Sequence, residues 1–221
     1  MLYRKKQCGC EKNEAVESEL LTSLLDTDGD STEEFLEQTR RICITGEIDE
    51  FTALYVNSQL QKFAISDKPV YMYLSSPGGN LMDGYAIIDQ MQLSPFPVHT
   101  IVRGQAHSMA AIITAYGTKG RRFITPHSCM MLHSVSLDLS TESIERAQKA
   151  FRYVQKDYDE LVSDLAGHTR LSPKKLTLLL SETCWMNAKE AIKVGIVDKI
   201  WTPKMEQAVN APAIKEEAKN A

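Results

Sequence analysis

Residues 70–102, VYMYLSSPGGNLMDGYAIIDQMQLSPFPVHTIV, predict a strand, a helix and a second strand in succession. Residues 70–74 are aromatic, β-branched or apolar, and the turn-forming run SSPGGN follows them. Apolar residues from 81 to 91 recur at helical spacing, and two prolines separate this helix from strand 98–102. Because this order forms a βαβ unit, the stretch predicts a parallel sheet covered by helices.

The flanking sequence continues the alternation of strands and helices in both directions. Short β-rich runs predict further strands at 41–46, 122–124, 130–132 and 197–201. Helical periodicity predicts helices at 51–60, 108–116, 143–165, 173–180 and 188–194. The helix at 143–165 is long and amphipathic, so we expect it to project and pack against another subunit. The sequence therefore predicts a mixed α/β fold with a mostly parallel sheet.

Composition and charge exclude several classes of protein. Apolar residues make up 43% of the 221 residues, which is enough for a packed core. The net charge of −4 argues against a nucleic-acid partner. No run of about 18 apolar residues predicts a membrane span, and the basic N-terminus lacks the apolar segment of a secretory signal.

The cysteines indicate a cytoplasmic protein with reduced thiols. Five cysteines, three of them scattered singly through apolar segments, do not resemble a disulfide framework. The pair Cys8 and Cys10 could bind a metal or oxidise, but no second ligand pair has matching spacing. We therefore expect neither a metal site nor a cofactor.

The polarity of the two ends predicts one domain with two extensions. Residues 1–36 are polar and charged, and we expect an N-terminal extension such as a propeptide or axial loop. Residues 37–202 carry the alternating pattern and form the predicted domain. Residues 203–221 are polar with mixed charge, which predicts a mobile C-terminal tail.

The segment GQAHSMA, residues 104–110, places a serine where a strand gives way to a helix. Open α/β sheets bind their ligands at this edge, so Ser108 is a candidate nucleophile. Serine is also a favoured helix N-cap, and the local pattern leaves both interpretations open. The segment lacks the Gly-x-Ser-x-Gly pattern of α/β-hydrolases.

Two further segments could complete a site for acyl transfer. The glycine pair Gly78–Gly79 follows a strand, and its amides could form an oxyanion hole or simply a strand–helix turn. His133 follows the strand 130–132 and could act as a general base, although a lone histidine is more often structural. No cluster of histidine, cysteine and acidic residues has metal-ligand spacing.

Four segments, taken together, resemble the Clp protease proteolytic subunit, a serine peptidase of the crotonase-like superfamily. They are YMYLSSPGG (71–79), GQAHSM (104–109), GTKGRRF (117–123) and MMLH (130–133), in the family's order and spacing. The similarity extends from about residue 41 to residue 201. The resemblance implies a spiral of ββα units with a mostly parallel sheet and a projecting handle helix, the segment 143–165.

The resemblance also implies a role for individual residues. Ser108 matches the nucleophile and His133 the general base that returns its proton to the leaving amine. Gly79 and Met109 match the positions whose amides form the oxyanion hole. In place of Ser134–Asp138 the family has Gln-Pro and a glycine-rich stretch that pairs with substrate, so substrate binding can differ here.

The third catalytic position departs from the family pattern. An aspartate is expected before the segment CWMNA, but the aligned residue is Thr183, with Glu182 adjacent. Loss of such a carboxylate costs about four orders of magnitude in a well-studied triad. Thr183 could accept the His133 N–H weakly, Glu182 could replace the carboxylate, or the site could be slow or silent.

The resemblance implies partners as well. Family members enclose their sites in two stacked heptameric rings and receive unfolded polypeptides from a hexameric AAA+ unfoldase, which alone binds ATP. The expected function is therefore a serine endopeptidase in a homo-oligomeric barrel. Three alternatives stay open: a silent ring subunit, a crotonase-like protein that binds an acyl-CoA, and a viral capsid-maturation peptidase.

Overall fold

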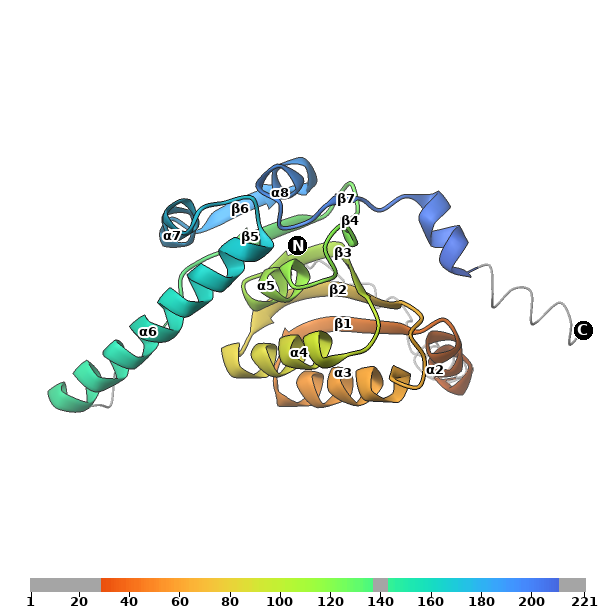
Figure 1. The fold of residues 1–221 in the computed structure, drawn as a ribbon, viewed down its shortest axis with the longest axis horizontal. Coiled ribbons are helices and arrows are strands. Elements are labelled where there is room, and N and C mark those ends of the chain that lie inside the picture. Colours follow the sequence, from red (N-terminus) through yellow and green to blue (C-terminus); the bar gives the residue numbers. More distant parts are fainter. Residues whose placement is uncertain (1–28, 137–142, 211–221) are drawn as a thin grey trace, which may run out of the picture.

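The computed structural model describes residues 29–136 and 143–210 as a mixed α/β domain (Figure 1). Its strands are β1 (Arg41–Ile48), β2 (Val70–Gly79), β3 (Val98–His107), β4 (Arg122–Ile124), β5 (Cys129–Leu132), β6 (Cys184–Asn187) and β7 (Lys199–Ile200). Its helices are α2 (Gly29–Gln38), α3 (Glu50–Phe63), α4 (Leu81–Leu93), α5 (Met109–Ala115), α6 (Ile144–His168), α7 (Pro173–Ser181) and α8 (Ala188–Val194).

Most strand pairs in the sheet are parallel. The order β1-β2-β3-β4-β7 contains only parallel neighbours, and α3, α4 and α5 contact strands or one another along it. Parallel sheets are covered by helices, so their strands carry nearly continuous apolar runs. Accordingly, Val70, Met72 and Leu74 of β2 are fully buried. The prediction of an α/β fold with a mostly parallel sheet is confirmed.

The sheet divides along β3. Thr100–Val102 pair with β4, whereas Gln105–His107 pair with β5, and Gly104 lies between these two halves with a φ of +79°. Beyond the division, β5 pairs with the antiparallel strand β6, which the sequence did not predict. The C-terminal ends of β2, β3 and β5 lie in this part of the sheet, and the candidate residues Gly79, Ser108 and His133 lie at these ends.

Helix α6 is the long projecting helix that the sequence predicts. Its N-terminal half extends from the body of the molecule in Figure 1, and Ser143 caps its first turn. Three buried residues, Leu161, Val162 and Leu165, attach its C-terminal half to the core. The exposed apolar residues of the projecting half include Ile144 and Phe151.

Glu206 attaches the residues that follow β7 to the sheet. Residues 203–210 are helical, and the Glu206 carboxylate accepts hydrogen bonds of 2.7 Å from both Arg103 and Trp201. It also lies 3.3 Å from Arg41. Burial alone would raise the pKa of Glu206, but these hydrogen bonds and positive charges outweigh it and lower the pKa. The first residues of the predicted tail are therefore held against the domain, and the domain boundaries stay predictions.

The helices and the cysteines of the described residues bear on membrane spanning and on disulfides. No helix within residues 29–136 and 143–210 combines the length and apolarity needed to cross a membrane. Cys43, Cys129 and Cys184 carry free thiols, whereas Cys8 and Cys10 lie outside the described residues.

Candidate active site

Ser108 lies in a strained turn between β3 and α5. Its φ of +51° and ψ of −123° are unfavourable for a residue with a Cβ atom. Arg40, Ser108 and Thr183 are the non-glycine residues with positive φ in the described ranges. Such strain costs of the order of 1–3 kcal/mol and concentrates at functional sites. Two of these three residues are candidates from the sequence.

The hydroxyl of Ser108 does not act as a helix cap. Ser108 occupies the N-cap position of α5, but its side chain makes no capping hydrogen bond. Asn80 and Asn187, at the same position of α4 and α8, each accept hydrogen bonds from two helix amides. The interpretation of Ser108 as a plain N-cap is therefore wrong, and its hydroxyl is available for other chemistry.

The close approach of β2 to Ser108 requires glycine at position 78. Gly78 has a φ of +96°, and a Cβ atom placed on it would lie 2.6 Å from the His107 carbonyl oxygen. The same atom would lie 2.7 Å from the Ser108 Cβ and 3.1 Å from the Met109 nitrogen. The distances to His107 and Ser108 are shorter than those that Cβ atoms make in proteins. Only glycine at position 78 therefore lets the end of β2 contact the Ser108 turn.

The backbone around Ser108 supplies amides suited to an oxyanion. Met109 is the first residue of α5, so no carbonyl of that helix can accept its N–H. Gly79 directly follows Gly78 and lines the same cavity as Met109 and Ser108. Two donors beside a nucleophile can stabilise the charge of a tetrahedral intermediate.

His133 lies at the end of β5, next to the Ser108 turn. The Ser108 amide donates a hydrogen bond of 2.7 Å to the Met131 carbonyl, which ties the two segments together. The His133 Nδ1 lies 2.6 Å from the Ser134 carbonyl oxygen. A carbonyl can only accept, so Nδ1 carries the proton and Nε2 of a neutral ring is free to take one.

Ser108 and His133 line one cavity of about 450 Å³. Gly79 and Met109 also line it, so the structure brings four of the sequence-predicted residues together. No hydrogen bond joins the Ser108 hydroxyl to the His133 ring within the described residues. Catalytic hydrogen bonds are often longer without substrate and shorten in the complex.

Thr183 directly precedes β6, the strand that pairs with the end of β5 next to His133. The antiparallel ladder pairs Leu132 with Cys184, so the next opposed positions are His133 and Thr183. Thr183 is exposed, and its φ is +52°. Glu182 is exposed at the C-cap of α7, one position further from this pairing. The imidazole is held by the Ser134 carbonyl rather than by either side chain.

His107 precedes the candidate nucleophile but is not a lining residue of its cavity. Its Nε2 lies 3.3 Å from the Cys129 Sγ, and its ring packs edge-on against Trp185 at 4.9 Å. Burial lowers the pKa of His107, which favours the neutral ring. His107 therefore adds no positive charge beside Ser108 at neutral pH.

One wall of the cavity comes from α6, which the sequence did not indicate. Four residues of α6 line the cavity: Tyr153, Val154, Asp157 and Leu161. The apolar stripe of this helix was the available signal, but its pattern does not tell which apolar residues face the core and which face a cavity. The other wall includes Ser134, Val135 and Ser136, whereas residues 137–142 lie outside the described part.

The comparisons with known proteins all indicate the same family. The family model "Clp protease" matches residues 27–204. The ATP-dependent Clp protease proteolytic subunit of Porphyromonas gingivalis is 34% identical over 165 residues, which cover 73% of each chain. Subunit 2 of Treponema denticola is 34% identical over 73% of this chain and 82% of its own.

A third relative agrees with these two. The ATP-dependent Clp protease proteolytic subunit of Streptococcus thermophilus is 33% identical over 167 residues. This alignment covers 74% of this chain and 85% of the relative. The family model spans the sheet, the Ser108 turn and β5. The chain therefore belongs to the Clp protease family.

Proposed function

We propose that this chain is a serine endopeptidase that hydrolyses unfolded polypeptides inside an oligomeric barrel. One observation carries the proposal: Ser108, His133, Gly79 and Met109 line the same cavity of about 450 Å³. Membership of the Clp protease family supports a peptidase role. The cavity is large enough for one amino-acid side chain and the adjoining backbone.

Each residue has a role in acyl transfer. The Ser108 oxygen attacks a peptide carbonyl while His133 Nε2 takes the hydroxyl proton. The amides of Gly79 and Met109 donate to the oxygen that becomes negative. His133 then gives its proton to the leaving amine. In the second half of the reaction His133 takes a proton from a water molecule that attacks the acyl–Ser108 ester, and returns it to the Ser108 oxygen as the carboxylic acid leaves.

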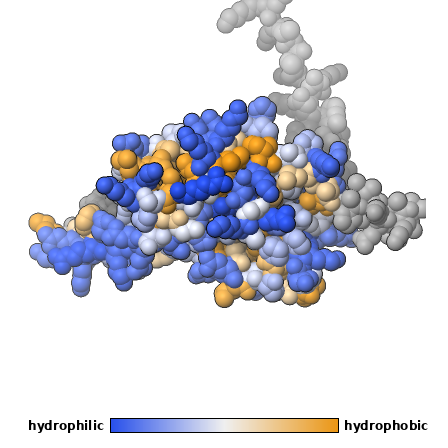
Figure 2. Space-filling model, turned by 45° about the horizontal axis from the view of Figure 1, so that its top comes forward, coloured by the Kyte–Doolittle hydropathy of each residue, from blue (hydrophilic) through white to orange (hydrophobic). Residues whose placement is uncertain are grey.

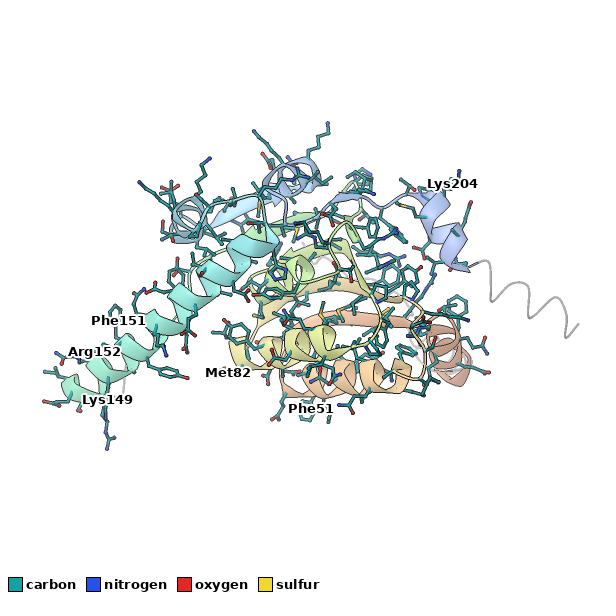
Figure 3. All side chains as sticks on the ribbon, in the orientation of Figure 1. Phe51, Met82, Lys149, Phe151, Arg152 and Lys204 are labelled. Carbon is teal, nitrogen blue, oxygen red and sulfur yellow. The ribbon has the colours of Figure 1, made fainter. Side chains whose placement is uncertain are left out.

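Exposed apolar side chains support assembly into a barrel. Phe51 and Leu54 of α3 are 71% and 69% exposed, and Phe151 of α6 is 58% exposed. Figure 3 shows Phe51 and Phe151 on separate parts of the molecule, and Figure 2 shows orange hydrophobic patches among hydrophilic residues. Such patches indicate interaction sites. We propose homo-oligomeric rings, which the resemblance implies are heptameric.

The names of the relatives support an ATP-dependent partner. All three relatives are described as ATP-dependent Clp protease proteolytic subunits. We therefore propose that a hexameric AAA+ unfoldase in the cytoplasm delivers unfolded chains to the barrel. The chain itself would need no cofactor, because its proposed chemistry uses only a serine, a histidine and backbone amides.

Labelling with a fluorophosphonate probe tests the proposed nucleophile. An activated serine forms a covalent adduct with the probe, so intact-mass measurement should show one adduct per chain, mapped to Ser108 by peptide sequencing. The Ser108→Ala and His133→Ala variants should remain unlabelled. Labelling that persists in Ser108→Ala, or no labelling of the natural chain, would contradict the proposal.

A catalytically weak or silent ring subunit is the second candidate. It is favoured by the lack of a charged partner at His133 Nδ1, where a complete triad has a carboxylate and this chain has the neutral Ser134 carbonyl. A carbonyl orients the ring but offers less stabilisation to the imidazolium than a full negative charge. A chain that assembles into rings but neither reacts with the probe nor cleaves peptides would establish this candidate.

A further inference from the structure

The cavity that holds Ser108 has a single carboxylate among its lining residues, Asp157. The rest of its wall is largely apolar and includes Leu81, Ile112, Val135 and Leu161. Asp157 is half-buried, so its carboxylate is partly withdrawn from water and would be favourably accompanied by a positive charge. Within the described residues, no cation forms an ion pair with Asp157. This arrangement leaves a negative charge facing the space that a substrate side chain would enter.

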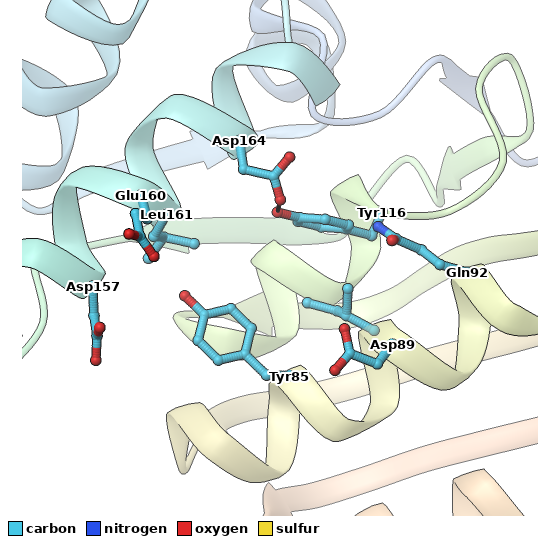
Figure 4. Close-up of a pocket in the computed structure, with 9 residues that line it drawn as sticks. Tyr85, Asp89, Gln92, Tyr116, Asp157, Glu160, Leu161 and Asp164 are labelled. Carbon is cyan, nitrogen blue, oxygen red and sulfur yellow. Dashed lines mark hydrogen bonds between the residues drawn. The ribbon is translucent and has the colours of Figure 1, made fainter.

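A second cavity, of about 260 Å³, places further carboxylates close to Asp157. Asp157 and Leu161 line both cavities, so the two adjoin at these residues. The second cavity also contains Asp89, Glu160 and Asp164, with the phenol of Tyr85 directed toward the α6 carboxylates (Figure 4). Burial and then the charges of Asp157, Asp164 and Glu160 raise the pKa of Tyr85.

Other contacts neutralise little of this acidic surface. Tyr116 donates a hydrogen bond to Asp164, which orients that carboxylate without cancelling its charge. Lys156 lies 3.6 Å from Glu160, but both side chains are well exposed, so solvent screens this pair. In the described ranges, no group of three or more histidine, cysteine or acidic residues is arranged to hold a metal ion. The acidic surface therefore fits an organic cation better.

We infer that the cavity beside Ser108 binds a lysine or arginine side chain of the substrate, with Asp157 as the residue that determines this specificity. The occupant is the residue whose carbonyl Ser108 attacks. Its methylene stem packs against Ile112 and Leu161, and its cationic head pairs with Asp157 at the entrance to the acidic cavity. This inference deepens the proposed peptidase function and rests on it.

Two fluorogenic peptides test the inference in the assembled full-length chain. They differ only at the residue before the cleaved amide, which is lysine in one and norleucine in the other. Norleucine keeps the unbranched stem and lacks the ammonium group, so the ratio of the two kcat/KM values isolates the charge. We expect the natural chain to prefer lysine by about tenfold, as a charge-assisted hydrogen bond would give.

The Asp157→Asn variant should lower this preference to about twofold or less, because the amide has the same shape without the charge. Asp159→Asn makes the same change on the same helix, at an exposed residue outside both cavities, and should keep the preference. A natural chain that cleaves the norleucine peptide equally well, or a preference unchanged in Asp157→Asn, would overturn the inference. The peptidase function would stand in both cases, since a peptide is cleaved.

A binding measurement separates failure of the inference from failure of the proposed function. Fluorescence anisotropy gives the Kd of labelled lysine and norleucine peptides for the Ser108→Ala variant, with and without Asp157→Asn. Tighter binding of the lysine peptide, lost with Asp157→Asn, supports the subsite even if neither peptide is cleaved. Equal affinity for the two peptides, or binding of neither, overturns it.

Discussion

The imidazole Nδ1 of His133 lies 2.6 Å from the carbonyl oxygen of the next residue, Ser134. Because the carbonyl accepts this hydrogen bond, it selects the tautomer with a free Nε2. In a complete triad an aspartate both selects this tautomer and stabilises the imidazolium. In this chain the Ser134 carbonyl can select the tautomer, although it brings no charge. The lack of an aspartate should therefore lower the rate by less than the loss of both effects would.

Thr183→Asp should increase the rate of peptide hydrolysis, because it adds the missing charge at the position opposite His133. The Ser134 carbonyl already selects the tautomer with a free Nε2. We therefore expect kcat to increase about tenfold, less than the effect of the aspartate in a complete triad. Steady-state hydrolysis of a fluorogenic peptide by the natural chain and the variant measures this gain.

Thr183→Asn is the matched control, since it has the shape of aspartate without the charge. It should leave kcat close to that of the natural chain. A slower Thr183→Asp variant would contradict the placement of residue 183 beside the ring. A large loss of activity in Glu182→Gln would instead assign the orienting carboxylate to Glu182.

Gly78→Ala should strongly lower activity, because the added methyl group collides with His107 and Ser108. The collision and the positive φ together should lower the free energy of unfolding by about 2–4 kcal/mol. Displacement of the Ser108 turn by about an ångström should lower kcat/KM by about a hundredfold. Thermal unfolding and peptide hydrolysis measure the two effects.

Gly120→Ala provides the control for backbone strain. Gly120 has a φ of +82°, similar to that of Gly78, but a Cβ atom there would meet nothing within 4 Å. This variant should lose only about 1–2 kcal/mol and retain activity. Equal effects of the two substitutions would show that the close approach to Ser108 is unimportant.

Glu206→Gln should destabilise the chain by about 1–2 kcal/mol, because the charge that Arg103 and Trp201 contact is lost. Glu37→Gln breaks an exposed ion pair with Lys62 and should cost about 0.5 kcal/mol or less. Chemical denaturation at pH 7 gives both values. Equal losses would indicate that Glu206 does not anchor residues 203–210.

The effect of Glu206→Gln should depend on pH. The pKa of Glu206 in the folded chain is below its ordinary value of 4.5, so its charge stabilises the fold above that pH. The stability difference between the natural chain and the variant should be constant near neutral pH. It should shrink as the pH falls below about 4.5 and through the folded pKa. A difference that grows on acidification would contradict the assigned contacts.

The sequence predicted most elements of the fold but not the short strand β6. The β-rich runs at 70–74 and 98–102 and the helical periodicity at 81–91 correspond to β2, β3 and α4. Strand β6 has only four residues, and it forms because it pairs antiparallel with β5, more than 50 residues earlier. Such pairing depends on tertiary packing rather than on local propensity.

The candidate site was predicted only in part, for a similar reason. Ser108, His133, Gly79 and Met109 could be chosen because four segments in a fixed order resemble one family. The contribution of Asp157 depends on how α6 docks against the core, which its periodicity does not specify. The Ser134 carbonyl is a backbone group present at every residue, so only the conformation of the loop makes it a partner of His133.

Hydrolysis of an unstructured peptide by the Ser108→Ala variant tests the central claim most directly. We expect loss of at least about a thousandfold in kcat, with the assembly unchanged by native mass spectrometry. Ser136→Ala removes another hydroxyl from the same cavity and should retain most of the activity. If Ser108→Ala cleaves the peptide at the natural rate, Ser108 is not the nucleophile and the proposed function is wrong.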